Sequence, residues 1–477
     1  MNIRDVDVAI LGAGSAGLTA YRAAKSHGAK VVLIERGPYG TTCARVACMP
    51  SKLLIAAADA AHHAADAAGF GVHAGPIRID GSAVMARVRA ERDRFVGFVL
   101  EGVERIDAGD RLVGSARFLG PQQLQVDGHT VVNAARIVIA TGSSPRMPPE
   151  LLGLGDRLID NEQIFEWTGL PESVAVLGAG VVGLELGQAL HRLGVRVALF
   201  GRGDRIGPLS DPDVIRSARD CIGGELDLRL GNKRFDAQRA GDGVLVQSAG
   251  EDGVVRSEHF SFVLAAAGRA PNLAGLQLEH AGLVLDKHGV PLFDRTTMQC
   301  GSSTIFIAGD ADAELPLLHE AVDQGRIAGS NAGGFPEVES GLRRTPLGVV
   351  FCDPQIALVG QRYSELVAQR HAIGSVSFDD QGRSRVMRQN RGLLRLYAEL
   401  GSGRFLGAEM VGPRAEHLAH LLAWACQSRM TVTQMLDMPF YHPVVEEGVR
   451  TALRRLQDQL DKDVPDIEHC ADCTPGM

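Results

Sequence analysis

The fold is decided by one stretch near the start of the chain, Val6-Asp7-Val8-Ala9-Ile10-Leu11-Gly12-Ala13-Gly14-Ser15-Ala16-Gly17. Its apolar first half predicts a buried parallel strand, and a small-residue helix and a second strand at 31–34 complete one βαβ unit. Gly12 allows the tight turn, Gly14 the close approach of backbone to pyrophosphate, and Gly17 close helix–strand packing. Amides at the helix start would face the phosphates, and Glu35 would accept hydrogen bonds from a ribose. The stretch therefore predicts a dinucleotide site.

The same pattern recurs in the middle of the chain. Val174-Ala175-Val176-Leu177 leads into Gly178, Gly180 and Gly183 at the same spacing, and a helix at 184–193 and a strand at 195–200 follow. One such motif is weak evidence, but two copies in the same strand–turn–helix–strand context are specific. Two dinucleotides are predicted, one held as a prosthetic group and one bound as a substrate.

The two copies differ at the residue that should meet the ribose. Glu35 of the first copy corresponds by position to Gly201 of the second, which is followed by Arg202 and Arg205. Loss of a carboxylate and gain of cations is the change expected for a 2′-phosphate. This favours NADPH over NADH as the second nucleotide. The alternative is that both arginines are solvated loop residues and the site takes NADH.

Length and composition limit the class of protein. The chain has 477 residues, enough for about three domains at roughly 150 residues each. The net charge of −8 gives no electrostatic footprint for nucleic acid, and no apolar run approaches the length of a membrane span. The N-terminus enters a strand without a signal peptide, so we expect a cytoplasmic protein with no membrane and no nucleic-acid partner.

Two of the eight cysteines, Cys43 and Cys48, lie close together in the sequence. Eight are too few for a disulfide scaffold, and close pairs in a reducing compartment are typically catalytic or metal-binding. Five positions of a regular helix turn by about 500°, which leaves the two side chains some 140° apart. A disulfide can therefore close only where the backbone departs from a helix, and such a bond would be strained and easily reduced. Spacing alone also allows two buried apolar cysteines.

The segment around this pair, Thr41-Thr42-Cys43-Ala44-Arg45-Val46-Ala47-Cys48-Met49-Pro50-Ser51-Lys52, resembles a family signature. It is similar to Gly-Gly-Thr-Cys-x-x-x-Gly-Cys-x-Pro-Ser-Lys of the class I pyridine nucleotide–disulfide oxidoreductases. That family includes dihydrolipoamide dehydrogenase, glutathione reductase, mercuric reductase and large thioredoxin reductases. The resemblance covers nearly the whole chain, since further family motifs are matched in order by Ile139-Ala140-Thr141-Gly142-Ser143, Gly268-Arg269-Ala270-Pro271-Asn272, Ile307-Ala308-Gly309-Asp310 and His442-Pro443-Val444-Val445-Glu446-Glu447.

The resemblance implies an α/β fold with two Rossmann-like domains, for FAD and NAD(P), and a C-terminal α+β dimerisation domain. Strand-like runs at 347–351, 392–400 and 406–411 and amphipathic helices at 415–430 and 445–460 fit the last of these. The expected boundaries are 1–145 for the first part of the FAD domain, 146–270 for the NAD(P) domain, 271–342 for the return to the FAD domain, 343–465 for the dimerisation domain and 466–477 for a cysteine-containing tail.

The resemblance also implies roles for single residues. Hydride would pass from NAD(P)H to FAD, and FAD would reduce the Cys43–Cys48 disulfide. Cys48 would lie nearest the flavin and Cys43 would exchange with the substrate as a thiolate. In the homodimer, His442 of the partner subunit would handle the proton, and Glu447 would orient it. Lys52 and Glu185 resemble the family's ion pair near the flavin. The cofactor-binding residues implied are Thr141, Gly142, Asp310, His319, Gly268 and Arg269.

Three residues around the cysteines depart from the signature. Thr41 and Ala47 replace glycines, and Arg45 replaces the usual Asn. No reacting group is lost. A cation at position 45 is expected to lower the pKa of a nearby thiol.

The substrate motifs favour the lipoamide branch. Leu318-His319-Glu320-Ala321 resembles the Ala-His-x-Ala of dihydrolipoamide dehydrogenases, and Val181 stands where glutathione reductases usually have a gating Tyr. We therefore predict a dihydrolipoamide dehydrogenase-like enzyme that acts on a small disulfide or a lipoyl group. The apparent NADPH site supports an alternative, an NADPH-dependent reductase of glutathione, mercuric ion or thioredoxin. A flavin transhydrogenase or NAD(P)H oxidase on the same scaffold, or a non-catalytic flavoprotein, would not need the cysteine pair.

The last residues hold a second pair, Cys470 and Cys473. Mercuric reductase and large thioredoxin reductases carry a C-terminal pair that accepts electrons from the active-site pair. The tail therefore either relays electrons or holds two idle thiols at a solvated terminus. A metal site with His469 would lack a fourth ligand, so no metal is predicted.

Overall fold

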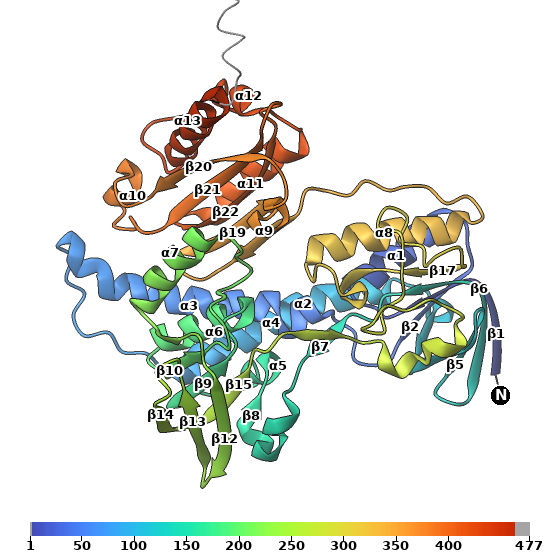
Figure 1. Ribbon diagram of the computed structural model, residues 1–477. Coiled ribbons are helices and arrows are strands. Elements are labelled where there is room, and N and C mark those ends of the chain that lie inside the picture. Colours follow the sequence, from blue (N-terminus) through green and yellow to red (C-terminus); the bar gives the residue numbers. More distant parts are fainter. Residues whose placement is uncertain (1, 463–477) are drawn as a thin grey trace, which may run out of the picture.

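The computed structural model describes residues 2–462 (Figure 1). Its first sheet has the order β3-β2-β1-β6-β5-β4, with β17 paired to the end of β6. The strands are β1 (Asn2–Leu11), β2 (Val31–Glu35), β3 (Arg111–Val113), β4 (Ala116–Gly120), β5 (Gln123–Val126), β6 (Thr130–Ile139) and β17 (Ile305–Ile307). Helices α1 (Ser15–Ser26) and α8 (Leu318–Gly334) pack side by side. The chain thus returns to its first sheet after residue 300.

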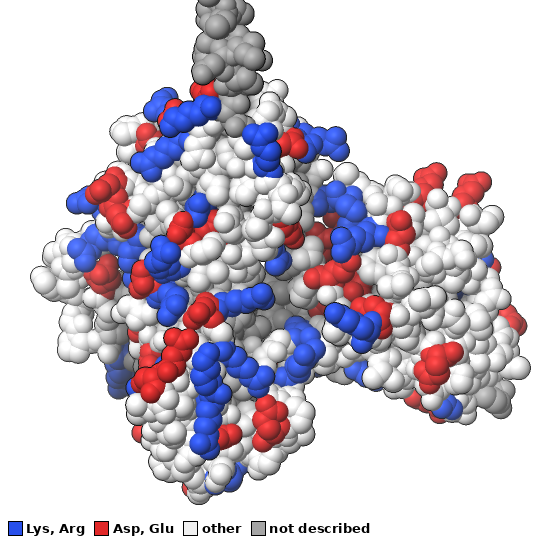
Figure 2. Space-filling view, in the orientation of Figure 1, with Lys and Arg blue, Asp and Glu red and all other residues white. Residues whose placement is uncertain are grey.

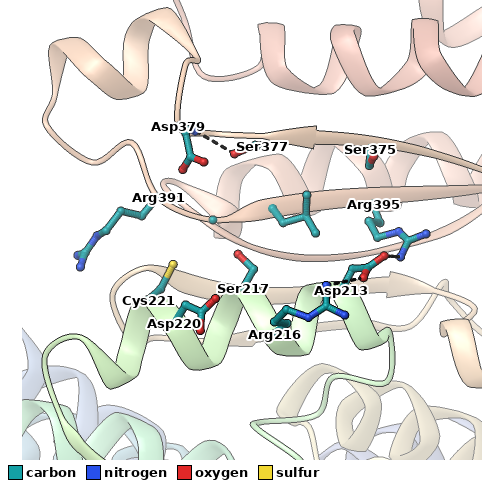
Figure 3. A pocket seen from close by; sticks show the side chains of 12 residues that line it. Asp213, Arg216, Ser217, Asp220, Cys221, Ser375, Ser377, Asp379, Arg391 and Arg395 are labelled. Carbon is teal, nitrogen blue, oxygen red and sulfur yellow. Dashed lines mark hydrogen bonds and ion pairs between the residues drawn. The ribbon is translucent and has the colours of Figure 1, made fainter.

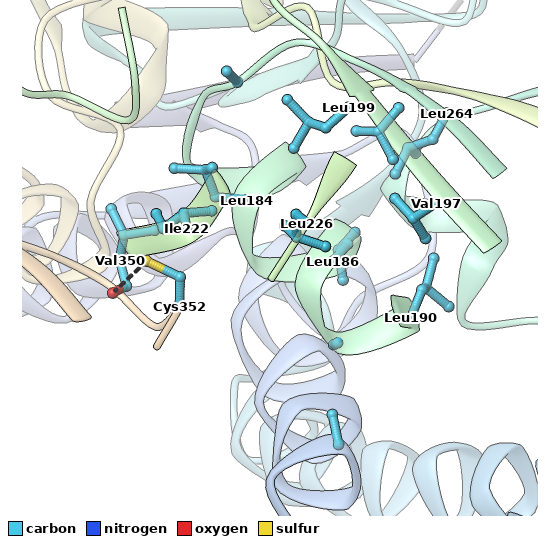
Figure 4. Packing of buried hydrophobic residues seen from close by; sticks show 14 of the residues in the cluster. Leu184, Leu186, Leu190, Val197, Leu199, Ile222, Leu226, Leu264, Val350 and Cys352 are labelled. Atoms are coloured by element: carbon cyan, nitrogen blue, oxygen red, sulfur yellow. Dashed lines mark hydrogen bonds between the residues drawn. The ribbon is translucent and has the colours of Figure 1, made fainter. Parts of the chain in front are cut away.

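The second sheet is parallel, with the order β11-β10-β9-β15-β8. It consists of β8 (Leu158–Ile159), β9 (Ser173–Leu177), β10 (Arg196–Phe200), β11 (Asp227–Arg229) and β15 (Phe262–Ala265), and it is accompanied by α6 (Val181–Arg192) and α7 (Pro212–Gly223). Leu184, Leu186 and Leu190 of α6 pack into the core beside this sheet (Figure 4). An antiparallel insert follows β11, formed by β12 (Arg234–Ala240), β13 (Gly243–Ala249) and β14 (Val255–Phe260).

The third sheet is antiparallel, with the order β18-β19-β22-β21-β20. Its elements are β18 (Leu347–Val350), β19 (Gln355–Gly360), β20 (His371–Ser377), β21 (Leu393–Glu399) and β22 (Phe405–Gly412), with α11 (Ala415–Gln427) and α13 (Glu447–Lys462) against it. The expected fold class is confirmed: two Rossmann-like units and a C-terminal α+β unit. The remaining helices include α4 (Gly81–Glu104), α5 (Asn161–Ile164), α9 (Tyr363–Leu366), α10 (Gly382–Val386) and α12 (Val432–Leu436).

The first two units are joined by two chain segments that pair with each other. β7 (Ser143–Pro145) leaves the first unit and β16 (Arg269–Pro271) returns to it, as an antiparallel pair. We propose the boundaries after residues 145 and 270 on this pairing. The predicted cysteine-containing tail, residues 466–477 with Cys470 and Cys473, lies outside the described residues.

A polar cavity of about 620 Å³ lies between α7 and the third sheet. Figure 3 shows Ser217 and Cys221 on α7 facing the strands that carry Ser375 and Arg395. No residue of either dinucleotide turn lines it. Basic and acidic side chains are interspersed over the face shown in Figure 2. Among the described helices, we find none with the length and apolar character that crossing a bilayer requires.

Candidate active site

The first dinucleotide turn connects β1 to α1. Gly12 has φ of +102°, and a Cβ there would collide with the carbonyl of Ala140, so only glycine fits. A Cβ at Gly17 would likewise meet the carbonyl of Gly12. Gly14, by contrast, has no atom within 4 Å of its Cβ position and is the N-cap of α1 without a side-chain cap. The turn therefore leaves open space at the helix start, where pyrophosphate is expected.

Glu35 closes this turn from the end of β2. Its carboxylate accepts hydrogen bonds from the amides of Ala13 (2.7 Å) and Gly37 (2.9 Å). Both bonds fix the carboxylate beside the phosphate turn. A ribose that binds there would find its acceptor already in place.

The flavin side of the site is built from the crossing segments. The Ser143 hydroxyl donates to Asp310 (2.6 Å) and accepts from Arg269 Nε (2.8 Å), and the Thr141 hydroxyl is buried without a partner in the described residues. A buried hydroxyl without a partner is expected where a bound molecule supplies the second half of a hydrogen bond. Together with the open space at Gly14, these residues fit FAD.

The second turn, between β9 and α6, repeats this geometry. Gly178 has φ of +121° and Gly180 caps α6 with open space at its Cβ position, as Gly14 does for α1. A Cβ at Gly183 would meet the carbonyl of Gly178. The backbone of both sites is therefore shaped for the same kind of ligand.

The second site lacks the carboxylate that closes the first. The amides of Ala179 and Gly203 correspond to those bound by Glu35, and within residues 2–462 neither has an acceptor. Arg202 pairs with Glu150 at 3.0 Å, and Arg205 is exposed. The site thus presents two amide donors and two nearby cations where the first site presents an acid.

The two cysteines lie on successive helices, α2 (Thr42–Val46) and α3 (Cys48–Asp66). Ala47 separates them with φ of −134° and ψ of −102°, far from helical values. The expected break in the helix therefore lies at this residue. Both thiols are free in this structure, and Cys43 donates a hydrogen bond to Cys48.

The thiols have opposite pKa shifts. The hydrogen bond from Cys43 and the charge of Lys52 lower the pKa of Cys48 to about 7, against the opposing effect of burial. The same hydrogen bond, together with burial, raises the pKa of Cys43. Lys52 is the cation with the largest effect on the pKa of Cys48. Burial raises the pKa of Glu162, and the charge of Arg45 opposes that rise. An effect of Arg45 on a thiol pKa stays a prediction.

Lys52, in the first unit, contacts one residue from each of the other two units. Its Nζ lies 2.7 Å from a carboxylate oxygen of Glu185 on α6, and 4.7 Å from the ring centroid of Phe351. Glu185 is 4% exposed, and its other oxygen accepts from the Phe351 amide at 3.0 Å. Sequence reasoning missed Phe351, since its contribution is a backbone amide and a ring face that follow no motif.

The C-terminal His–Glu pair is formed within the chain but faces outward. His442 Nδ1 lies 3.0 and 3.1 Å from the two oxygens of Glu447, which also accepts from the Val444 amide. The side chain of His442 is 81% exposed, and Tyr441 beside it is also exposed. No contact joins His442 to Cys43 within the described residues. His319 is exposed at the start of α8.

Comparisons with known proteins match this arrangement. A family model described as pyridine nucleotide-disulphide oxidoreductase matches residues 6–325, and the dimerisation domain of the same family matches residues 347–453. Because the first match alone covers more than half of the chain, the chain belongs to the pyridine nucleotide-disulphide oxidoreductases.

Individual relatives include two kinds of enzyme. A mercuric reductase of Acidithiobacillus ferrooxidans is 32% identical over 98% of this chain and 85% of its own. A dihydrolipoyl dehydrogenase of Thermus scotoductus is 30% identical over 96% of this chain and 98% of its own. The solved structure of LpdA from Mycobacterium tuberculosis is 28% identical, with a TM-score of 0.80 over 96% of this chain and 100% of that one.

The chain is therefore a flavoprotein oxidoreductase of the disulfide reductase type, which uses FAD and NAD(P)H and forms a homodimer. Bound FAD supplies the route for two electrons between a nicotinamide and the cysteine pair. In the chain itself, the pKa of Cys48 is lowered and that of Cys43 is raised, and His442 lies within hydrogen-bond distance of Glu447.

Proposed function

We propose that the chain carries electrons from NADPH through the Cys43–Cys48 pair to a small disulfide, with a lipoyl group as the favoured substrate. The observation that carries this proposal is the placement of Cys43 and Cys48 on successive helices, α2 and α3, with Lys52 of α3 held by Glu185, and the lowered pKa of Cys48 supports it. The lipoyl assignment rests on the motif at His319 and on the dihydrolipoyl dehydrogenases among the relatives. A cytoplasmic location is part of this proposal.

The chemistry balances in two thiolate exchanges. Cys43, deprotonated by His442 of the partner subunit, attacks one sulfur of the substrate disulfide and releases the other as a thiolate, which takes that proton. The Cys48 thiolate then attacks the Cys43 sulfur of this mixed disulfide, which releases the second substrate sulfur as a thiolate that takes a proton from solvent, and forms the Cys43–Cys48 disulfide. Two electrons from NADPH restore the dithiol.

The second nucleotide site supports NADPH as the donor. Ala179 and Gly203 offer amide donors that have no acceptor among the described residues, Arg202 and Arg205 add charge, and Gly201 places no carboxylate at its position to repel a phosphate. A Cβ at Gly201 would lie 2.7 Å from Leu230, so an acid placed there must first displace that side chain.

An anaerobic titration with NADPH tests the dithiol proposal. We expect a long-wavelength absorbance band from the Cys48 thiolate beside the bound flavin. The Cys43→Ser variant should keep this band and lose turnover, and Cys48→Ser should lose both. Absence of the band in the unmodified enzyme would contradict the dithiol mechanism.

A reductase of mercuric ion is the second candidate function. The mercuric reductases of Acidithiobacillus ferrooxidans and Shigella flexneri, 32% and 33% identical, favour it. Cys470 and Cys473 are the chain's own thiols for such a relay. Turnover with NADPH over lipoamide, oxidised glutathione, Hg(II) and a thioredoxin separates the candidates, and a double Cys470→Ser, Cys473→Ser variant with unchanged turnover on all four would end the relay proposal.

A further inference from the structure

Arg202 follows Gly201, which stands where the first site has the ribose-binding acid Glu35, and Arg202 already has an ion-pair partner. Arg202 Nη2 lies 3.0 Å from Glu150 Oε1 in the 3₁₀ segment η3 (Pro149–Arg157). The two side chains are 76% and 55% exposed, so little besides their mutual attraction holds the pair together. An anion of higher charge that arrives at Arg202 can therefore compete with Glu150.

The position of this pair relative to the second turn is fixed by the backbone. Gly201, directly before Arg202, donates to the Arg229 carbonyl (2.8 Å) and accepts from the Asn232 amide (2.9 Å). This holds Arg202 at the carboxyl end of β10, the place that corresponds to Glu35 at the end of β2. Glu150 thus brings a carboxylate to the ribose end of the second site from a separate element.

We propose that Glu150 is a specificity-determining residue, an internal counter-ion that the 2′-phosphate of NADPH must displace from Arg202. This inference rests on the proposed NADPH site. A phosphate monoester carries about −1.5 to −2 charges near pH 7, more than a carboxylate, so the exchange favours the ligand but leaves Glu150 repelled by it. Glu150 therefore weakens binding of the phosphorylated nucleotide and leaves binding of the unphosphorylated one unchanged. When NADP⁺ dissociates, Glu150 pairs with Arg202 again.

The test uses calorimetry on the FAD-loaded dimer with two probes, adenosine 2′,5′-bisphosphate and adenosine 5′-monophosphate. In Glu150→Gln, we expect the Kd of the bisphosphate to fall by about two- to five-fold, the range for an exposed ion pair. The Kd of the monophosphate should stay the same. Asp156→Asn is the matched control, because Asp156 is an exposed carboxylate on the same η3 segment that pairs with Arg239.

The Arg202→Met variant separates this inference from the NADPH assignment. If Arg202→Met leaves bisphosphate binding unchanged, the NADPH site itself is wrong. If Arg202→Met weakens it while Glu150→Gln does not strengthen it, the site stands and the role of Glu150 is wrong. Weaker monophosphate binding in Glu150→Gln would also overturn the inference, because Glu150 would then serve the ribose hydroxyls directly.

Discussion

Cys43 and Cys48 divide the chemistry because they share one proton. The thiol of Cys43 donates to Cys48, so the pKa of Cys48 falls to about 7 while that of Cys43 rises. In the proposed mechanism, the thiol that attacks the substrate is therefore the one that keeps its proton longest. That mechanism needs an external base at Cys43, and we propose His442 of the partner subunit for this role.

The pH dependence of the dithiol form follows from this pKa. The long-wavelength band of the reduced enzyme should grow as the pH rises through about 7, since the Cys48 thiolate forms there. Lys52 stabilises the charged form, so Lys52→Met should move the midpoint upward by about one pH unit. Arg45→Met is the comparison variant and should move the midpoint less, because Lys52 has the larger effect on the pKa of Cys48. A pH titration of the anaerobic dithiol enzyme measures both, and a shift in Arg45→Met alone would reverse our assignment of the acting cation.

Thr41 stores backbone strain directly before the cysteines. It has φ of +58° and ψ of 149°, a region that is essentially restricted to glycine, and its hydroxyl accepts from the Ala44 amide as the N-cap of α2. Thr41→Ala loses the cap and keeps the strain, whereas Thr41→Gly loses the cap and releases the strain. We expect the glycine variant to be more stable than the alanine variant by about 1–3 kcal/mol in urea unfolding. Equal stabilities would show that the turn is relaxed.

At the scale of elements, α6 links the nucleotide turn to the flavin side of the site. Its N-terminus is the second phosphate turn, and one face of it carries Glu185, Gln188 and Arg192. Glu185 accepts from the Phe351 amide, Gln188 bonds both the amide and the carbonyl of Asp353, and Arg192 pairs with the Asp353 carboxylate at 2.8 Å. The spacing of three and four residues places all three side chains on one face of α6, where they contact residues 351–353 between β18 and β19 of the third unit.

Arg192 is the anchor of this contact. Its side chain is 3% exposed and also pairs with Glu225 (2.6 Å) and Asp59 (3.1 Å). Arg192→Met would leave three carboxylates without their common cation, so we expect a loss of about 3–5 kcal/mol in the free energy of unfolding. Arg216→Met, at an exposed pair with Asp213, should cost about 1 kcal/mol or less. Urea unfolding measures both, and similar losses in the two variants would argue against the anchor.

The elements that sequence could predict are those with a strong local pattern. Both Gly-x-Gly-x-x-Gly units were predicted in the right order, because apolar strands and glycine turns are local features, but β1 begins at Asn2, four residues before the predicted start, and α6 begins at Val181, three residues before it. The α11 helix ends at Gln427, three residues earlier than its apolar pattern indicated. The insert β12–β14 was missed: β12 alternates half-buried and exposed residues that are mostly polar, and only pairing with β13 makes it a strand.

Only those residues of the site that belong to a sequence motif could be predicted. Lys52 and Glu185 follow from family resemblance, and their 2.7 Å contact joins residues far apart in sequence. Phe351 and the amides of Ala179 and Gly203 carry no sequence signal, because they act through backbone atoms or ring faces that tertiary structure brings into place.

At the scale of the whole molecule, the single chain holds every group of the site but does not assemble them. His442, hydrogen-bonded to Glu447, is exposed on the dimerisation domain, and within residues 2–462 no contact joins it to the cysteines. The homodimer supplies a second copy of the same domain. If His442 of one subunit acts at the cysteines of its partner, two-fold symmetry requires that the partner's His442 acts at the cysteines of the first subunit.

Subunit mixing tests this arrangement. Cys43→Ser and His442→Ala homodimers should each be nearly inactive. In a heterodimer of the two, one site combines both defects, while the other combines an intact Cys43 with His442 of the partner subunit and is complete. Random exchange at equal concentrations makes half of the dimers mixed, and each has one working site, so we expect about a quarter of the unmodified activity to return. If cysteine and histidine acted within one chain, every site in the mixture would remain defective and no activity would appear. Mixing two batches of the Cys43→Ser variant through the same unfolding and refolding cycle controls for recovery during exchange.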